Sequence, residues 1–140
     1  MEITDLQLLR LDGRPASSLA SGEGLRIELE YQAPQPVEAP IFGVTIARED
    51  GLSVYDTSTA SGGPAVARVQ GWGKVALVIE RLDLGEGAYF VDAGIYQKDW
   101  DYAYDYHWHV YRFQIESGRG EKGILRPPHR WEHRNGPPLA

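Results

Sequence analysis

Hydrophobic and polar residues alternate along most of the chain, and the alternation is cleanest just after Gly24. One parity there is apolar (Leu25, Ile27, Leu29, Tyr31) and the other is charged (Arg26, Glu28, Glu30). Successive side chains of a strand point to opposite faces, so the pattern predicts a strand with one buried and one wet side. The same period of two recurs in segments 2–11, 42–46, 52–59, 75–79, 88–97 and a last strand ending at Ile115.

No window shows the 3.6-residue period of an amphipathic helix. About eight short strands separated by turn signals therefore predict an all-β fold, an antiparallel β-sandwich of immunoglobulin-like or jelly-roll type. Residues 33–40 hold three prolines and are predicted to form a loop that crosses between the sheets. The small, Gly-rich residues 60–71 are predicted to form a mobile loop, and Ile124 and Leu125 a short strand. The predicted sandwich covers residues 1–133, and 134–140 is expected to be a flexible tail.

Aromatic residues concentrate in the stretch from Tyr96 to Tyr111, YQKDWDYAYDYHWHVY. Asp and His residues separate the rings, so the stretch is abnormal for packing alone. Flat rings stack on the apolar faces of sugars, and carboxylates accept hydrogen bonds from hydroxyl groups, which makes a sugar site one interpretation. A Tyr-rich hairpin that covers a sheet edge is an equally open interpretation. Burial of the rings at a subunit interface is a third, although charges are depleted in interface cores.

Composition limits the classes of partner. The chain has 140 residues, which is one domain by length, and no cysteine, which excludes disulfides and thiolate metal sites. Its net charge of -6 without a Lys/Arg cluster argues against a nucleic-acid partner. No apolar run approaches the roughly 20 residues of a membrane-spanning helix.

Catalytic and metal-binding motifs are not found. His107 and His109 have the spacing of the imidazole pair in cupin metal sites, but Phe113 and Gln114 stand where a carboxylate ligand is needed. The acidic residues near Trp100 lack the Gly and the distal Glu of a calcium loop. Gly-x-Ser-x-Gly and phosphate-loop motifs are absent from the sequence. The expectation is a domain without catalytic residues, metal or cofactor; a jelly-roll enzyme that modifies sugars stays an alternative.

Three stretches together carry a resemblance to a known family. They are PIFGVTIAREDG at 40–51 followed by YDTST at 55–59, LDLGEGAY at 82–89, and GILRPPHRW at 123–131. In order and spacing the chain resembles the C-terminal domain of the Wzt-type ATP-binding subunit of bacterial ABC transporters that export O-antigen polysaccharide. The resemblance covers nearly the whole chain.

The resemblance implies a β-sandwich carbohydrate-binding module that recognises the non-reducing end of the polysaccharide and couples it to export. It implies a homodimer, with terminal strands that can be exchanged, and a transporter's nucleotide-binding and transmembrane parts as partners. It also implies a cytoplasmic location at the inner face of the inner membrane. In that family a nucleotide-binding domain precedes this one, so the chain is expected to be an excised domain.

Ligand residues vary within the family, so the site is predicted from the residues themselves. The predicted stacking surface consists of Trp100, Tyr102, Tyr104 and Trp108. The predicted hydrogen-bonding groups are Asp92, Asp99, Asp101, Asp105 and His107, with Tyr96 and Arg112 flanking. Arg112 is expected to matter most if the terminal sugar is acidic. Loss of one central ring is expected to cost about 1–3 kcal/mol of binding free energy.

Overall fold

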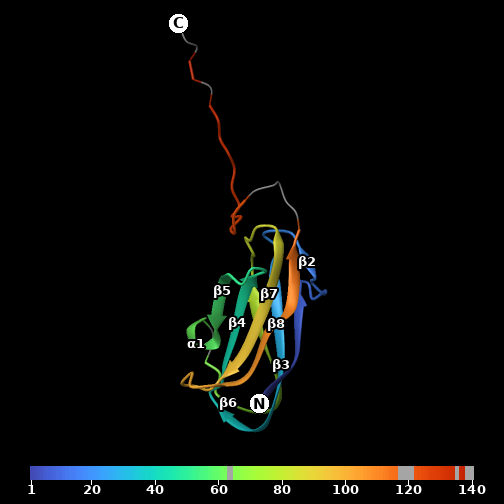
Figure 1. Ribbon diagram of the computed structural model, residues 1–140, viewed down its shortest axis with the longest axis vertical. Coiled ribbons are helices and arrows are strands. Elements are labelled where there is room, and N and C mark those ends of the chain that lie inside the picture. The colour runs from blue at the N-terminus through green and yellow to red at the C-terminus, as the bar shows by residue number, and fades with distance from the viewer. Residues whose placement is uncertain (63–64, 117–121, 135, 138–140) are drawn as a thin grey trace.

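The computed structural model of the chain describes residues 1–62, 65–116, 122–134 and 136–137. In these ranges the chain forms two stacked β-sheets and one turn of helix, α1 (Thr59–Gly62) (Figure 1). The strands are β1 (Glu2–Leu9), β2 (Ser18–Leu19), β3 (Leu25–Glu38), β4 (Ile41–Arg48), β5 (Ser53–Ser58), β6 (Arg68–Ile79), β7 (Gly87–Tyr96) and β8 (Ala103–Ile115).

The first sheet has three strands in the order β1-β3-β6, and the second has five in the order β2-β8-β7-β4-β5. The prediction of an all-β sandwich with about eight strands is confirmed. One pairing corrects the expectation that every pair is antiparallel, because β2 runs parallel to β8. The two residues of β2 lie along the end of β8. There the carbonyl oxygens of Ser17 and Leu19 accept hydrogen bonds from the N–H groups of Gln114 and Glu116, respectively.

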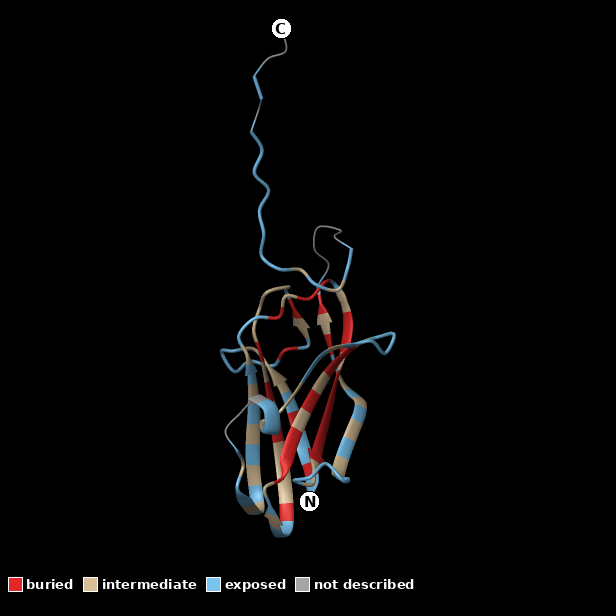
Figure 2. Cartoon of the chain, turned by 90° about the vertical axis from the view of Figure 1, so that its left-hand side faces the viewer, coloured by how far each residue is buried: buried red, intermediate tan, exposed pale blue. Residues whose placement is uncertain are grey.

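The core lies between the sheets and follows the predicted alternation. Leu25, Ile27 and Leu29 of β3 are at most 2% exposed. On the second sheet Tyr89 stacks on Phe113, with ring centroids 5.5 Å apart, and both are 1% exposed. Figure 2 shows buried positions alternating with half-buried and exposed ones along the strands. The opposite faces of both sheets point away from this core.

The loop predicted over 33–40 is wrong, because β3 continues to Glu38. Its prolines, Pro34 and Pro36, lie in a register shift between Ala33 and Val37, where no regular ladder bond is lost to a residue without an N–H group. The chain crosses to the second sheet only at residues 39–40.

The boundaries predicted for the loop over 60–71 are only partly right, and its mobility stays a prediction. Its start forms α1 and its end belongs to β6, which begins at Arg68. Both β3 and β6 are longer than the strands predicted from the sequence. The two extensions occur together because Val37 and Glu38 of β3 pair with Val69 and Arg68 of β6. Residues 63–64 lie outside the described residues.

After β8 the chain leaves the sandwich at the end opposite the β7–β8 turn, as Figure 1 shows for residues 122–134. The strand predicted at Ile124 and Leu125 is reduced to an isolated bridge between Leu84 and Leu125. Arg126 N–H also donates to the Asp83 carbonyl oxygen over 2.7 Å. Residues 135 and 138–140 of the predicted tail lie outside the described residues, and its flexibility stays a prediction.

Candidate functional site

A cleft of about 630 Å³ opens on the outer face of the five-stranded sheet, near the β7–β8 turn. Strands β4, β5, β7 and β8 and helix α1 contribute to it. Its described lining residues are Gly43, Thr45, Asp56, Thr57, Ser58, Ala60, Ser61, Asp92, Tyr96, Trp100 and Tyr106. Rings, hydroxyl groups and carboxylates are therefore gathered in one concave surface.

Two rows of cross-strand neighbours form this part of the sheet. In one row Ser58 pairs with Gly43, Gly43 with Gly94, and Gly94 with Tyr106. In an antiparallel sheet, directly opposed residues point to the same face. The two central glycines of this row therefore leave the outer face bare between the hydroxyl of Ser58 and the ring of Tyr106.

The Tyr96 ring lies down in the space that the glycines leave. A Cβ atom placed on Gly94 would lie 2.5 Å from Tyr96 Oη, and one on Gly43 would lie 3.1 Å from Tyr96 Cε2. Since real Cβ atoms do not approach other atoms to 2.5 Å, the ring can take this position only because residue 94 is glycine. Tyr96 thereby lies over both glycines in the row.

Trp100 extends the aromatic surface from the turn between β7 and β8. Its ring centroid lies 5.1 Å from that of Tyr96, with the planes inclined by 41°. The turn is closed by the N–H of Trp100 donating to the Gln97 carbonyl over 2.8 Å. Trp100 has a φ of 65°, a left-handed conformation that costs a non-glycine residue about 1–2 kcal/mol. The turn thus holds an exposed indole against Tyr96 at a conformational cost.

The second row carries the carboxylates. Asp56 of β5 pairs with Thr45 of β4, and Thr45 pairs with Asp92 of β7. Thr45 Oγ1 donates to Asp56 Oδ1 over 2.8 Å. Both carboxylates therefore stand on the cleft face, on either side of one threonine.

Asp92 is the one buried charged residue among those the structure describes, at 5% exposure. A bulge in β8 surrounds it: Val91 pairs with Tyr111 and Ala93 with His107, so Asp92 faces three residues. The central residue of the three, His109, has a φ of 56°, and its N–H donates to Asp92 Oδ1 over 2.7 Å. The bulge thus supplies the donor that holds the buried carboxylate.

The two phenols of the cleft stay protonated over the ordinary pH range. Burial raises the pKa of Tyr96, and the neighbouring Tyr106, Asp56 and Asp92 raise it further. Burial likewise raises the pKa of Tyr106, with Asp92 and Asp56 adding to the shift. The cleft therefore offers neutral O–H groups beside its two carboxylates.

Three of the predicted site residues come together in the cleft, namely Asp92, Tyr96 and Trp100. Asp99 and Asp101 are exposed in the turn, where their N–H groups lie near the Gln97 side chain. Neither belongs to the described lining.

Two further predicted stacking residues pair with each other instead. Tyr102 and Tyr104 make an edge-to-face contact at 5.3 Å, and Tyr104 packs against the core. Trp108 is 65% exposed, and its ring lies 3.9 Å from that of His109 in the bulge. Arg112 is exposed and pairs with Phe90, beyond the bulge.

Asp105 and His107 point to the opposite face of the sheet, because they pair with the core residues Ile95 and Ala93. There Asp105 Oδ2 accepts the N–H of Ile3 over 2.7 Å, which ties β1 to β8. His107 Nδ1 lies 2.7 Å from the Tyr111 hydroxyl oxygen. The structure therefore separates these two residues from the cleft.

Several cleft residues were not among those predicted from the sequence. They are Gly43, Thr45, Asp56, Ser58, Ser61 and Tyr106. A single glycine inside a strand often marks a close backbone approach, so Gly43 and Gly94 carried a usable signal. Asp56 and Ser58 carried none, since only strand pairing places β5 beside β7 through β4.

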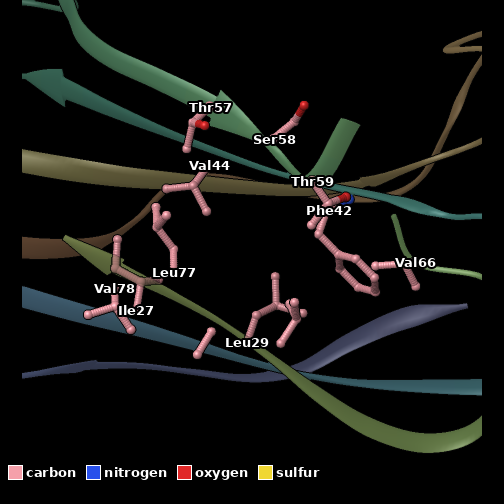
Figure 3. A pocket seen from close by; sticks show the side chains of 12 residues that line it. Ile27, Leu29, Phe42, Val44, Thr57, Ser58, Thr59, Val66, Leu77 and Val78 are labelled. Carbon is pink, nitrogen blue, oxygen red and sulfur yellow. The ribbon is translucent and has the colours of Figure 1, made fainter. Parts of the chain in front are cut away.

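A second cavity, of about 280 Å³, lies between the sheets where β5 and β6 form open edges. Figure 3 shows its side chains, which are mainly aliphatic: Ile27, Leu29, Val44, Val66 and Leu77 point into it. A sugar placed there would leave most hydroxyl groups without partners, at a cost of about 1–3 kcal/mol each. The outer cleft suits a polar ligand better.

The described residues contain no group of three or more His, Cys, Asp or Glu side chains that could hold a metal ion. Among them there is also no helix long and apolar enough to cross a membrane.

The fold defines the chain as a domain of the two-sheet β-sandwich class. A profile of the Wzt C-terminal domain family matches residues 1–127, and the chain belongs to this family. It is similar to the O-antigen export system ATP-binding protein RfbB of Myxococcus xanthus, with 29% identity over 131 residues. That match covers 94% of this chain but only 29% of the length of RfbB.

A solved structure, the crystal structure of the C-terminal domain of Wzt, has the same fold. The TM-score is 0.81 at 15% sequence identity, and the match covers 94% of this chain and 83% of that one. The sandwich is therefore the fold of the family.

Proposed function

We propose that the chain is the part of an O-antigen exporter's ATP-binding subunit that binds the polysaccharide. The cleft on the five-stranded sheet would hold the sugar at the non-reducing end of the polymer. The observation that carries the proposal is the convergence of Tyr96, Trp100 and Tyr106 with Asp56 and Asp92 in one cleft. Membership in the Wzt C-terminal domain family and the similarity to an O-antigen export protein support it.

Recognition follows from the arrangement of the side chains. The exposed ring of Trp100 offers a flat surface for the C–H face of a sugar, beside the half-buried ring of Tyr96. Asp56 and Asp92 accept hydrogen bonds from sugar hydroxyls, and the phenol of Tyr106 can donate one. Rings alone would bind sugars with little selectivity; the fixed acceptors select which hydroxyls are presented.

The domain performs no chemistry on its ligand in this proposal. Asp92 is held by a backbone N–H and Asp56 by a threonine hydroxyl, so both act as fixed acceptors. ATP hydrolysis belongs to the subunit's nucleotide-binding part, and the transmembrane part moves the polymer. The domain would work at the cytoplasmic face of the inner membrane, where a bound chain end would mark the polymer as ready for export.

Trp100→Ala tests the position of the site against Trp108→Ala. Removing the cleft indole should weaken binding by about 1–3 kcal/mol, through lost stacking and apolar contact. Trp108, outside the described lining, should have a smaller effect when replaced. Isothermal titration with the O-polysaccharide of the bacterium that encodes the chain measures both, with Trp72→Ala on the other sheet as a matched control for an exposed Trp. A larger loss for Trp108→Ala would move the site to the bulge.

We also propose that the domain forms a homodimer, in which the segment 122–134 packs on a second copy. In this segment Leu125 is 70% and Trp131 92% exposed. Residues 124–126 hydrogen-bond to residues 83–85 of the sandwich, and beyond them the segment extends away from it (Figure 1). Large exposed apolar side chains on an extended segment are typical of an interaction site. Because the segment leaves the sandwich at the end opposite the cleft, pairing there leaves the cleft open. Exchange of terminal strands between the copies is one form that this contact would take.

Truncation after residue 121 is expected to convert a dimer to a monomer, and Trp131→Ala to weaken the dimer. Sedimentation velocity over a range of protein concentrations measures both changes. The glycan affinity of the truncated chain, expressed per cleft, should be unchanged. If the 140-residue chain stays monomeric at high concentration, the dimer is refuted and the proposal for the cleft is unaffected.

A further inference from the structure

The cleft contains charges of one sign. Asp56 and Asp92 are its acidic groups, and none of its described lining residues is Lys, Arg or His. The remaining polar groups are hydroxyls, which carry no charge at neutral pH. A ligand in the cleft therefore meets two carboxylates and no cation among the described lining residues.

Several cations on the strands and turns that form the cleft lie outside its described lining. Arg48, on β4, forms an ion pair with Asp50 in the β4–β5 turn. Arg112 lies beyond the bulge and opposite Phe90, and Lys98 is exposed in the β7–β8 turn. His109 stands beside Asp92, with its Nδ1 atom 3.4 Å from Asp92 Oδ1, and it also lies outside the described lining of the cleft.

Burial strengthens the effect of the charge at the bottom of the cleft. Asp92 is only 5% exposed. Salt and water screen a buried charge less than an exposed one. The cleft phenols respond to the same field, since the carboxylates add to the effect of burial in raising the pKa values of Tyr96 and Tyr106. An anionic ligand group would experience the same repulsion.

We infer that the cleft selects its sugar by charge: it accepts neutral sugars and sugars with a free amino group, and it rejects uronic acids and phosphorylated sugars. This inference rests on the proposed function of the cleft. A protonated amine carries three donors, and its hydrogen bonds to carboxylates are charge-assisted and shorter than neutral ones. A sugar carboxylate or phosphate would face Asp56 and Asp92 without a compensating cation in the described lining.

The test uses methyl glycosides of glucose, glucosamine and glucuronic acid, and the same series for galactose, at neutral pH. The indole N–H signal of Trp100 in ¹⁵N–¹H spectra, assigned with Trp100→Ala, reports binding. At low salt the amino glycoside should bind about fivefold more tightly than the neutral one, and the uronate about fivefold more weakly, as expected for partly exposed charges. Asp56→Asn should reduce both differences. A uronate that binds as tightly as the neutral glycoside would overturn the inference.

The natural polymer separates this inference from the proposed function. The O-polysaccharide of the encoding bacterium is titrated into the chain, and its non-reducing terminal residue is determined chemically. Binding of a polymer with a neutral or amino-bearing end, weakened in Trp100→Ala, supports both proposals. Binding of an acidic end at the same cleft overturns the charge selection and keeps the function. Absence of binding by a folded chain overturns the function itself.

Discussion

Replacing Gly94 with valine is expected to abolish glycan binding while the sandwich stays folded. A Cβ at residue 94 would lie 2.5 Å from Tyr96 Oη and 2.6 Å from its Cζ, so the ring must leave its place over the glycines. The added methyl groups would then occupy the same space. Loss of the Tyr96 position together with filling of the cleft should lower affinity by at least about a hundredfold.

The fold should tolerate the change, since the clashing atoms are the free end of one side chain on the outer face. Valine also suits a strand better than glycine, so the urea midpoint should not fall. Titration with the O-polysaccharide and urea unfolding measure the two quantities separately. Ala76→Val on the exposed side of β6 is the matched control, because it creates the same residue on the other sheet. Full affinity in Gly94→Val would show that the ligand does not contact the Tyr96 ring in its place over Gly43 and Gly94.

The core of the sandwich could be predicted from the sequence. Alternation alone identified the core: Leu25, Ile27 and Leu29 were expected inside and are buried. A period of two defines the faces of a strand from its own residues, without knowledge of its neighbours. The fold class could therefore be predicted from the alternation within each strand.

Strand partners do not follow from the same pattern. The site prediction was drawn mainly from one aromatic stretch, and it included Asp105 and His107, which face the other sheet. Asp56 was outside the prediction because it reaches Asp92 only through Thr45, across two strand pairings. A cleft made from several strands depends on long-range register, and one sequence carries little information about register.

Local breaks in the alternation were the second source of error. Prolines at 34 and 36 indicated a loop, yet the strand continues past them because they fall in a register shift. The bulge around His109 acts in the other direction, since it brings a backbone N–H to Asp92 that an uninterrupted strand would not direct there. Both features depend on the partner strand, which the local sequence does not specify.

Replacing Phe113 with alanine is expected to produce the largest loss of stability among changes to β8. Phe113 is 1% exposed and stacks on Tyr89, so its removal loses apolar burial and leaves a cavity between the sheets. Such truncations cost about 3–5 kcal/mol of unfolding free energy. Urea denaturation followed by circular dichroism measures the loss, and Phe113→Leu, which leaves a smaller cavity, should lose less.

Tyr106→Ala on the same strand should show the opposite behaviour. Tyr106 points to the outer face and is 46% exposed, so its loss should change stability by less than about 1 kcal/mol. Its ring belongs to the cleft, and glycan affinity should fall by about 1–3 kcal/mol. Phe113→Ala, kept folded at low temperature, should bind with nearly normal affinity because no core atom reaches the ligand. Equal losses of affinity in the two variants would mean that binding depends on the rigidity of the sheet more than on the side chains that line its outer face.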